Sequence, residues 1–409
     1  MRGAAPAAAL TQLWSQLEGQ FGAYTGVGDV AVKDAAPFVN ATVTTYFANA
    51  TVPLIVTVDA KGLVAGLHLG EPGPAASPPG GSSAAPAAPS PTPVGSAAAY
   101  VKPDAFTETE VTVGIAPWTL PGTLSMPAGN GPFPAVVLVA GSGPQDRDET
   151  VGPNAPLRDL AWGLASNGIS VLRYDKRTKA HGTEMAAEVD KVTVRDEVID
   201  DAIAAIDLLR ATPGVDPGRV FLAGHSLGGY LAPRIAADAN GRLAGIALLE
   251  ANARPLQRLI EDQLAYLASD AGGSDPSAQA MLAALPAQVA LVESADLSPA
   301  TPASSLPLGI PAAYWLDLRG YDPVTTARDL SIPIFITQGG RDYQVPPAEL
   351  SAWRSGLGDR AGVSVREYPS LNHLLMAGTG PSRPAEYAQP GHVAPELVAD
   401  LAGWVNGTR

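Results

Sequence analysis

From about residue 105 onward, short apolar runs alternate with longer stretches that have helical periodicity. Runs this short and continuous are typical of strands buried on both faces of a parallel sheet, because both rows of side chains then contact helices. The six runs are Ala135–Ala140, Ser170–Arg173, Val220–Ala223, Gly245–Leu249, Ile332–Gln338 and Val363–Tyr368. Two further strands, Glu110–Ile115 and Trp118–Met126, precede them as a predicted hairpin. The pattern predicts an α/β fold, with a mostly parallel sheet and helices on both faces.

The chain is longer than one domain usually needs, and its composition changes along its length. Residues 1–70 are predicted to form a small α+β domain, in which an amphipathic helix precedes three strands. These strands are expected at Phe38–Phe47, Val52–Val58 and Leu63–Leu67. Residues 71–104 are rich in proline, glycine, alanine and serine, a composition typical of a linker. Residues 105–409 then form the larger domain.

Within the larger domain, the alternation of strands and helices is interrupted over residues 251–331. This segment contains leucine and isoleucine at helical spacing, which indicates an amphipathic helix. The apolar positions are Leu256, Leu259, Ile260, Leu264 and Leu267. We therefore predict a helical cap inserted into the sheet series at residues 251–331.

Charge and composition exclude several classes of function. The net charge of −14 argues against a nucleic-acid partner, because neutralising phosphates needs a basic surface. The chain has no cysteine, and no His/Asp cluster has ligand spacing, so we expect neither a metal nor a cofactor. No apolar run approaches the ~18 residues of a membrane span. The N-terminus lacks the apolar stretch of a signal peptide, so an exported protein with its signal removed and a cytoplasmic protein both stay open.

The run Gly224–Gly228 has the Gly-x-Ser-x-Gly pattern of a nucleophilic serine. The alternative is a glycine-rich turn with a surface serine. The context favours the nucleophile, because a strand-like run, Arg219–Ala223, precedes the motif and a helix-like run, Tyr230–Ile235, follows it. Such a tight turn lifts the serine above the sheet and leaves no room for side chains at its flanks. We predict that Ser226 is the nucleophile.

A serine hydroxyl needs a base that removes its proton, and the chain has five histidines. His373 follows the last predicted strand, where a parallel sheet would bring a base to the serine; a structural loop histidine is the alternative. His225 is expected to point away from its neighbour in the turn. His68 belongs to the small domain, His181 to a polar loop, and His392 to a Gly/Pro-rich tail.

The third member of a triad is a carboxylate that orients the histidine. Asp342 follows the strand Ile332–Gln338 through a glycine turn, and Glu250, directly after the preceding strand, is its main rival. Asp175 is expected to be a structural acid that pairs with Lys176 or Arg177. The predicted order along the chain is Ser, Asp, His, which is the order of the α/β-hydrolases.

Acyl transfer also needs hydrogen-bond donors for the developing oxyanion. One is expected to be the backbone N–H of Leu227, the residue after the nucleophile. The other is expected from the glycine-rich loop after the strand Ala135–Ala140, with Ser142 as the donor and Gly143 as the alternative. A simple tight turn without this role is the competing interpretation of the loop.

Five segments together resemble a bacterial branch of the α/β-hydrolase superfamily, whose members are esterase-like enzymes that often carry a small N-terminal domain. The segments are Gly141–Asp148, Gly224–Gly229, Tyr314–Leu318, Gln338–Val345 and Leu371–His373. Ser226, Asp342 and His373 match the triad positions of that family. Ala140 departs from the pattern, because many relatives carry His before the Gly-Ser-Gly run.

The resemblance implies carboxylesterase activity on small to medium acyl esters, through an acyl-enzyme intermediate. A serine peptidase, amidase or thioesterase on the same fold is the alternative, and a non-catalytic binding protein is a more distant one. Tyr343 and Trp315 are candidate substrate contacts. The expected partner is a small-molecule ester, and the oligomeric state, including a dimer, stays open.

Overall fold

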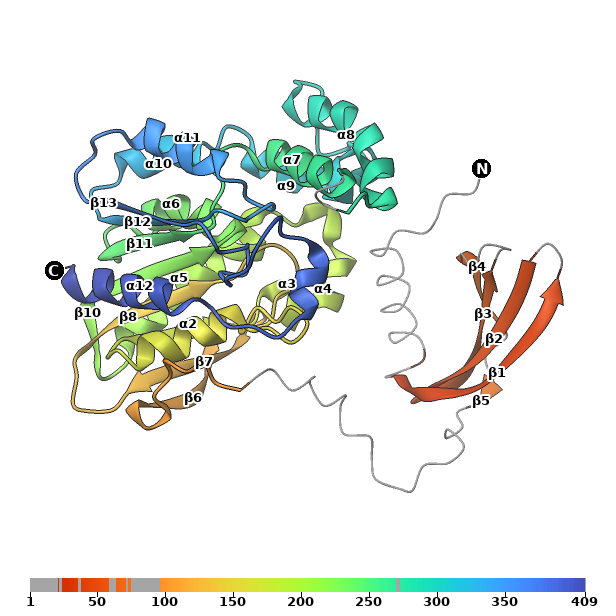
Figure 1. Cartoon of the computed structure of the whole chain (residues 1–409), viewed down its shortest axis with the longest axis horizontal. Coiled ribbons are helices and arrows are strands. Elements are labelled where there is room, and N and C mark those ends of the chain that lie inside the picture. The colour runs from red at the N-terminus through yellow and green to blue at the C-terminus, as the bar shows by residue number, and fades with distance from the viewer. Residues whose placement is uncertain are drawn as a thin grey trace. The chain divides into compact units, whose positions relative to one another are not determined.

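The computed structural model describes residues 21, 24–35, 38–58, 64–70, 73–74, 96–269 and 273–408. The chain divides into two compact units, Met1–Thr92 and Pro93–Arg409 (Figure 1). The domain limits expected from the sequence, at residues 70 and 105, stay predictions, and each unit is described by itself below.

The smaller unit contains an antiparallel sheet. Its strands are β1 (Tyr24–Ala35), β2 (Phe38–Phe47), β3 (Ala50–Val58), β4 (Val64–Leu69) and β5 (Gly73–Pro74). The first four are neighbours in chain order, and β5 pairs with β3. The sequence gives little signal for β1, because its glycines and aspartates have low strand propensity. The predicted helix before residue 21 and the turn at residues 59–62 lie outside the described residues.

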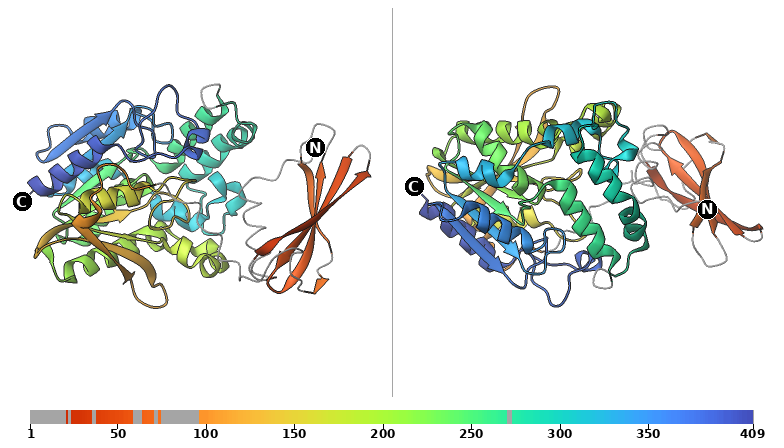
Figure 2. Two further views of the ribbon diagram at one scale, coloured as in Figure 1. Left: turned by 60° about the horizontal axis from the view of Figure 1, so that its bottom comes forward. Right: turned by 90° about the horizontal axis from the view of Figure 1, so that it is seen from above.

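The larger unit is built on an eight-stranded sheet in the order β13-β12-β11-β10-β8-β9-β7-β6 (Figures 1 and 2). The strands are β6 (Phe106–Val113), β7 (Leu120–Pro127), β8 (Phe133–Val139), β9 (Ser170–Tyr174), β10 (Val215–His225), β11 (Gly245–Leu249), β12 (Ile334–Gly339) and β13 (Val363–Tyr368). Neighbours from β9 to β13 pair in parallel. The β6–β7 hairpin joins the edge in antiparallel pairing. The predicted parallel sheet and its hairpin are confirmed.

Alternate residues of the central strands contribute to two apolar cores, one on each face of the sheet. In β10, Val220 and Leu222 belong to one core, while Phe221 and Ala223 belong to the other. Successive side chains of a strand point to opposite faces, and here both faces are covered by helices. This explains why the strands appear in the sequence as unbroken apolar runs.

Helices cover both faces of the sheet. Helices α2 and α12 pack in the core on one face, and α5, α6 and α11 pack in the core on the other (Figure 1). The described helices outside the 251–331 segment are α2 (Pro156–Ala165), α3 (Arg177–Ala180), α4 (Gly182–Ala187), α5 (Asp200–Ala211), α6 (Leu227–Ala239), α11 (Ala348–Leu357) and α12 (Pro395–Gly407). With the sheet, they form the α/β-hydrolase fold expected from the sequence.

A segment between β11 and β12 adds three helices at one end of the sheet (Figure 1). These are α7 (Leu256–Ala268), α8 (Pro276–Glu293) and α9 (Ala312–Leu318). Helix α10 (Pro323–Asp329) follows in the same segment before the chain enters β12. Within the part of the chain that the structure describes, no helix combines the length and the apolar character needed to cross a bilayer.

Candidate active site

The turn between β10 and α6 places Ser226 at the carboxyl edge of the sheet. Ser226 has φ 53° and ψ −117°, and its backbone N–H donates to Leu249 O of the neighbouring strand at 2.9 Å. A non-glycine residue at positive φ is strained and is retained where the surrounding structure enforces it. Strand pairing and the start of α6 together hold the serine in this conformation.

The glycines that flank Ser226 are required by close approach of the backbone. A Cβ atom on Gly224 would collide with the backbone of Gly228, and one on Gly228 would collide with the carbonyl oxygens of Val139 and Ala140. The turn therefore packs directly against the end of β8. This contact brings the loop after β8 next to Ser226.

His373 and Asp342 lie together in the loops after β13 and β12. His373 Nδ1 lies 2.7 Å from Asp342 Oδ2, and both side chains are buried. Asp342 Oδ1 accepts hydrogen bonds from the backbone N–H groups of Gln344 and Val345, at 2.8 and 2.9 Å. These bonds fix the carboxylate, which in turn fixes the imidazole. Nε2 is then the ring nitrogen left for proton transfer.

Glu250, the rival acid, occupies a different place. Its side chain is completely buried, and Oε2 accepts a hydrogen bond from Gly339 N at 2.6 Å. Burial raises the pKa of Glu250 above its usual range, and the nearby Asp342 carboxylate raises it further. Glu250 therefore supports the end of β12, whereas Asp342 is the carboxylate that contacts His373.

His225 connects two parts of the site. Nδ1 lies 2.9 Å from Glu149 Oε2, and Nε2 lies 2.8 Å from the backbone oxygen of His373. Burial alone would lower the pKa of His225, but the Glu149 carboxylate outweighs it and raises the pKa to about 9. The ring is thus a cation that donates from both nitrogens. The sequence carries no signal for this contact, because Glu149 is 76 residues away.

Burial shifts the pKa values of Asp342 and His373 in opposite directions. Burial raises the pKa of Asp342. Burial lowers the pKa of His373, and the positive charge of His225 lowers it further. Buried groups favour their neutral forms, since desolvation penalises charge. The imidazole of His373 is therefore neutral at physiological pH, the form that can accept a proton.

The loop after β8 is held by two buried charged side chains. Gly141 N donates to Glu149 Oε1 at 2.7 Å, and Gly141 O accepts from Lys176 Nζ at 2.8 Å. Lys176 also contacts Glu197 at 2.6 Å, so its charge is paired. The N–H and the carbonyl oxygen of Gly141 are both hydrogen-bonded, so the amide of Ser142 is the next donor in the loop.

The two predicted oxyanion donors lie close to the serine. Gly141 precedes Ser142, and a Cβ atom on Gly141 would lie 3.1 Å from Ser226 Cβ. Leu227 is the first residue of α6, where backbone N–H groups have no acceptor within the helix. The geometry is compatible with the sequence-based assignment of both amides.

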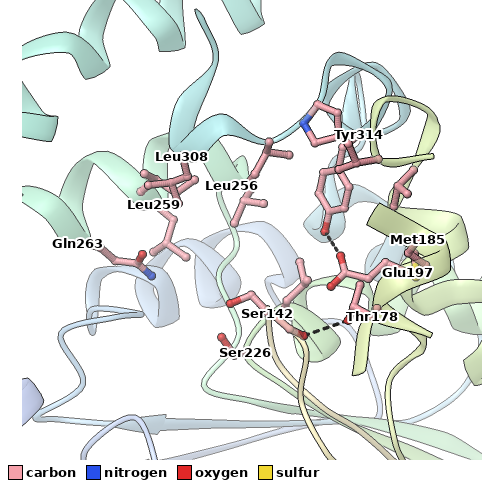
Figure 3. Close-up of a pocket in the computed structure, with 18 of the residues that line it drawn as sticks. Ser142, Thr178, Met185, Glu197, Ser226, Leu256, Leu259, Gln263, Leu308 and Tyr314 are labelled. Carbon is pink, nitrogen blue, oxygen red and sulfur yellow. Dashed lines mark hydrogen bonds between the residues drawn. The ribbon is translucent and has the colours of Figure 1, made fainter. Parts of the chain in front are cut away.

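A cavity of about 480 Å³ opens beside Ser226 and Ser142 (Figure 3). Its walls are mainly apolar and come from α4, α7 and the segment that leads into α9. They include Met185, Leu256, Leu259, Ile260, Leu308 and Ile310. Tyr314 OH donates to Glu197 Oε2 at 2.8 Å at one end of the cavity. We refer to this space as the large cavity.

The two candidate substrate contacts differ in position. Tyr343 lines a second, smaller pocket that Ser226 and His373 also line. Trp315 is 1% exposed and donates to the Ile310 backbone, so it belongs to the core beneath the segment. Its neighbour Tyr314 lines the large cavity instead, because successive residues of a helix point about 100° apart.

Other titratable groups singled out in the sequence lie outside this arrangement. Asp175 is a structural acid, as expected. Its partner is Arg147, with Nε 3.1 Å from Oδ1, and not Lys176 or Arg177 as the sequence suggested. His181 contacts the Thr119 backbone oxygen, and His392 contacts Asp159. The described residues include no group of three or more His, Asp and Glu side chains that could hold a metal ion.

Comparison with known proteins shows which family the chain belongs to. A family model described as "Serine aminopeptidase, S33" matches residues 156–379, more than half of the chain. The chain is 40% identical over 306 residues to Esterase EstD of Thermotoga maritima, a match that covers 75% of this chain and 69% of the relative. The chain belongs to this family of serine hydrolases in the α/β-hydrolase superfamily.

Solved structures of low sequence identity are also similar to this α/β-hydrolase. An esterase of Pyrococcus furiosus has a TM-score of 0.46 and 14% identity, over 75% of this chain and 92% of the other. Est1E of Butyrivibrio proteoclasticus has a TM-score of 0.46 and 14% identity, over 72% of this chain and 95% of the other.

We predict that Gly224→Ala lowers the free energy of unfolding by about 3 kcal/mol, because the added methyl group meets backbone that cannot move aside. Gly403→Ala, in α12 with no atom near the added methyl group, is the matched control and is expected to leave stability unchanged or to raise it. Urea unfolding followed by circular dichroism measures both. Equal stability of Gly224→Ala and the parent would contradict the packing described for the turn.

We predict that Glu149→Gln lowers the free energy of unfolding by about 3 kcal/mol near neutral pH, since it leaves the buried His225 cation without its partner. Folding raises the pKa of His225, so the stability that the Glu149–His225 pair contributes is complete below pH ~6.5. It is lost as the pH rises through about 9. Unfolding curves across this range should converge at high pH. Glu188→Gln, in an exposed pair with Lys191, is the control and should behave like the parent.

Proposed function

We propose that this chain is a serine carboxylesterase that hydrolyses small to medium acyl esters through Ser226, His373 and Asp342. The observation that carries the proposal is the 2.7 Å contact between His373 Nδ1 and Asp342 Oδ2, in loops that meet at the strained turn of Ser226. The similarity to a relative named an esterase supports ester substrates.

The proposed reaction has two acyl-transfer steps. His373 takes the proton of Ser226 as the serine oxygen attacks the ester carbonyl, and the oxyanion accepts hydrogen bonds from the amides of Ser142 and Leu227. His373 then gives the proton to the leaving alcohol, and the acyl group stays on Ser226. Water, activated by His373 in the same way, releases the acid. Asp342 keeps the imidazole oriented throughout and stabilises the imidazolium.

The charge state of the large cavity supports an ester over an aminoacyl substrate. Glu197 is the carboxylate among the described residues that line this cavity, and it is already paired with Lys176 and hydrogen-bonded by Tyr314. An aminoacyl group would bring a cation, whose burial beside apolar walls needs an unpaired acid. A neutral acyl chain needs none.

We also propose that residues 251–331 act as a cap over this site, within a catalytic domain of residues 105–409. The contribution of α7 and of the segment before α9 to the wall of the large cavity supports this role. The small domain predicted at residues 1–70 and the linker predicted at residues 71–104 offer no constellation of catalytic side chains in the sequence.

The nucleophile is tested with Ser226→Ala. We expect the loss of p-nitrophenyl butyrate hydrolysis by a factor of about 10³ or more, and the loss of fluorophosphonate labelling, because no other group supplies the covalent step. An exposed serine variant, Ser298→Ala in the 251–331 segment, serves as the matched control. Labelling that survives in Ser226→Ala would contradict the assignment. Faster cleavage of an aminoacyl anilide than of the ester by the parent would favour the peptidase alternative.

The pH dependence tests the base. Since His373 must be neutral and its pKa is lowered, the acid limb of kcat/KM is expected below pH ~6.5. His225→Gln removes a positive neighbour, which makes protonation of His373 easier, so the limb should move to higher pH. His181→Gln, whose ring contacts Thr119 instead, is the control and should leave the limb in place. An unchanged limb in His225→Gln would contradict the coupling between the two rings.

A further inference from the structure

Two separate spaces meet at Ser226. The large cavity lies on the side of α4 and α7, and a pocket of about 290 Å³ lies on the side of the Asp342 and His373 loops. We call the second space the small pocket. Ser142 and Ser226 line both the large cavity and the small pocket. His373 lines the small pocket and not the large cavity.

The position of His373 decides which part of an ester lies in which space. In the tetrahedral intermediate, the leaving alcohol oxygen must receive a proton from His373, so that oxygen lies within hydrogen-bond reach of the imidazole. The acyl group is the other substituent of the same carbon and points away from the base. The alcohol therefore occupies the small pocket and the acyl chain occupies the large cavity. This step rests on the proposed Ser–His–Asp mechanism.

The two spaces differ in chemistry. Nine of the twenty described residues that line the large cavity are leucine, isoleucine, valine or methionine, and its carboxylate, Glu197, is paired. The small pocket has side chains that donate and accept hydrogen bonds, among them Gln145, Gln344 and Tyr387. Gln344 Nε2 donates to Tyr387 OH at 3.2 Å, so these two polar groups face the same region.

The small pocket also has an aromatic wall. Tyr343 and Tyr387 both line it, with ring centroids 6.2 Å apart and planes 15° apart. Tyr266 continues the stack behind Tyr343, at 4.9 Å and 10°. Flat aromatic faces beside hydrogen-bonding groups suit a ligand with C–H faces and hydroxyl edges. The charged pair in this pocket, Glu149 and His225, is neutral as a whole, so it favours an uncharged ligand.

We propose that the preferred substrates are esters of an alkanoic acid with a polyhydroxylated alcohol, such as glycerol or a monosaccharide. The alkyl chain of the acid occupies the large cavity, and the free hydroxyl groups of the alcohol bind in the small pocket to Gln344 and Tyr387. Gln344 and Tyr387 then determine specificity for the alcohol, and Leu256 contributes to specificity for acyl-chain length.

The test compares matched esters on the full chain. Glyceryl monobutyrate is compared with propyl butyrate, and 6-O-butyryl glucose with cyclohexylmethyl butyrate, so that each pair differs in hydroxyl groups and shares its acyl group. Propyl acetate, butyrate and hexanoate give the dependence on acyl length. We expect kcat/KM to favour a polyol ester over its alkyl match, and to rise by up to about fourfold per added methylene. The glycerol and glucose pairs show which alcohol the pocket fits.

Two variants separate the two spaces. Gln344→Met keeps the side-chain length and is expected to lower the polyol preference by about two- to tenfold, the value of one hydrogen bond, while the gain per methylene stays the same. Leu256→Trp fills the large cavity and should reduce the hexanoate-to-acetate ratio while the polyol preference stays the same. Urea unfolding followed by circular dichroism verifies that both variants are folded.

The outcomes distinguish this proposal from the proposed function. No ester hydrolysis, or hydrolysis that survives in Ser226→Ala, would overturn the mechanism and this inference with it. Hydrolysis that depends on Ser226 but shows no polyol preference in either pair would overturn the inference alone. The same holds if Gln344→Met alters acyl-length dependence and Leu256→Trp alters the polyol preference, because the two spaces would then be assigned the wrong way round.

Discussion

The parallel pairing of β8 to β13 is the constraint on which the site depends. Parallel strands end at the same edge, so the loops after β8, β10, β12 and β13 meet although they are far apart in the chain. These loops carry the Gly141 peptide, Ser226, Asp342 and His373. An antiparallel strand at any of these places would have sent its loop to the opposite edge. The antiparallel hairpin of β6 and β7 lies at the rim of the sheet, where it does not disturb this convergence.

Buried charges then give the converged loops a single geometry. The Gly141 peptide is held by Glu149 on one side and by Lys176 on the other, and each of these has a second partner, His225 or Glu197. Buried charges are tolerated when they are paired and hydrogen-bonded, and removing one partner is costly. The two pairs lie on the two sides of the loop beside Ser226. They provide directed hydrogen bonds without a net charge, which suits an uncharged ester.

The histidine next to Ser226 in the turn holds two loops of the site together. His225 links the Glu149 carboxylate to the backbone of His373, and so connects the loop after β8 with the loop after β13. Glu149 and Lys176 hold the loop after β8 through the N–H and the carbonyl oxygen of Gly141. A positive φ of 53° at Glu149 turns its buried side chain into the site.

The sequence by itself determined the α/β fold, because strands buried on both faces must be continuous apolar runs and the runs alternate with helices. It also predicted Ser226, Asp342 and His373 as a triad, from a glycine-flanked serine after a strand and from an acid and a histidine in loops that follow later strands. The tertiary structure decided the partners of the remaining polar groups. Arg147 binds Asp175, Glu149 binds His225, and Tyr314 rather than Trp315 reaches the large cavity. Such contacts depend on how loops distant in sequence pack and on the rotation of each helix, and local sequence patterns carry information about neither.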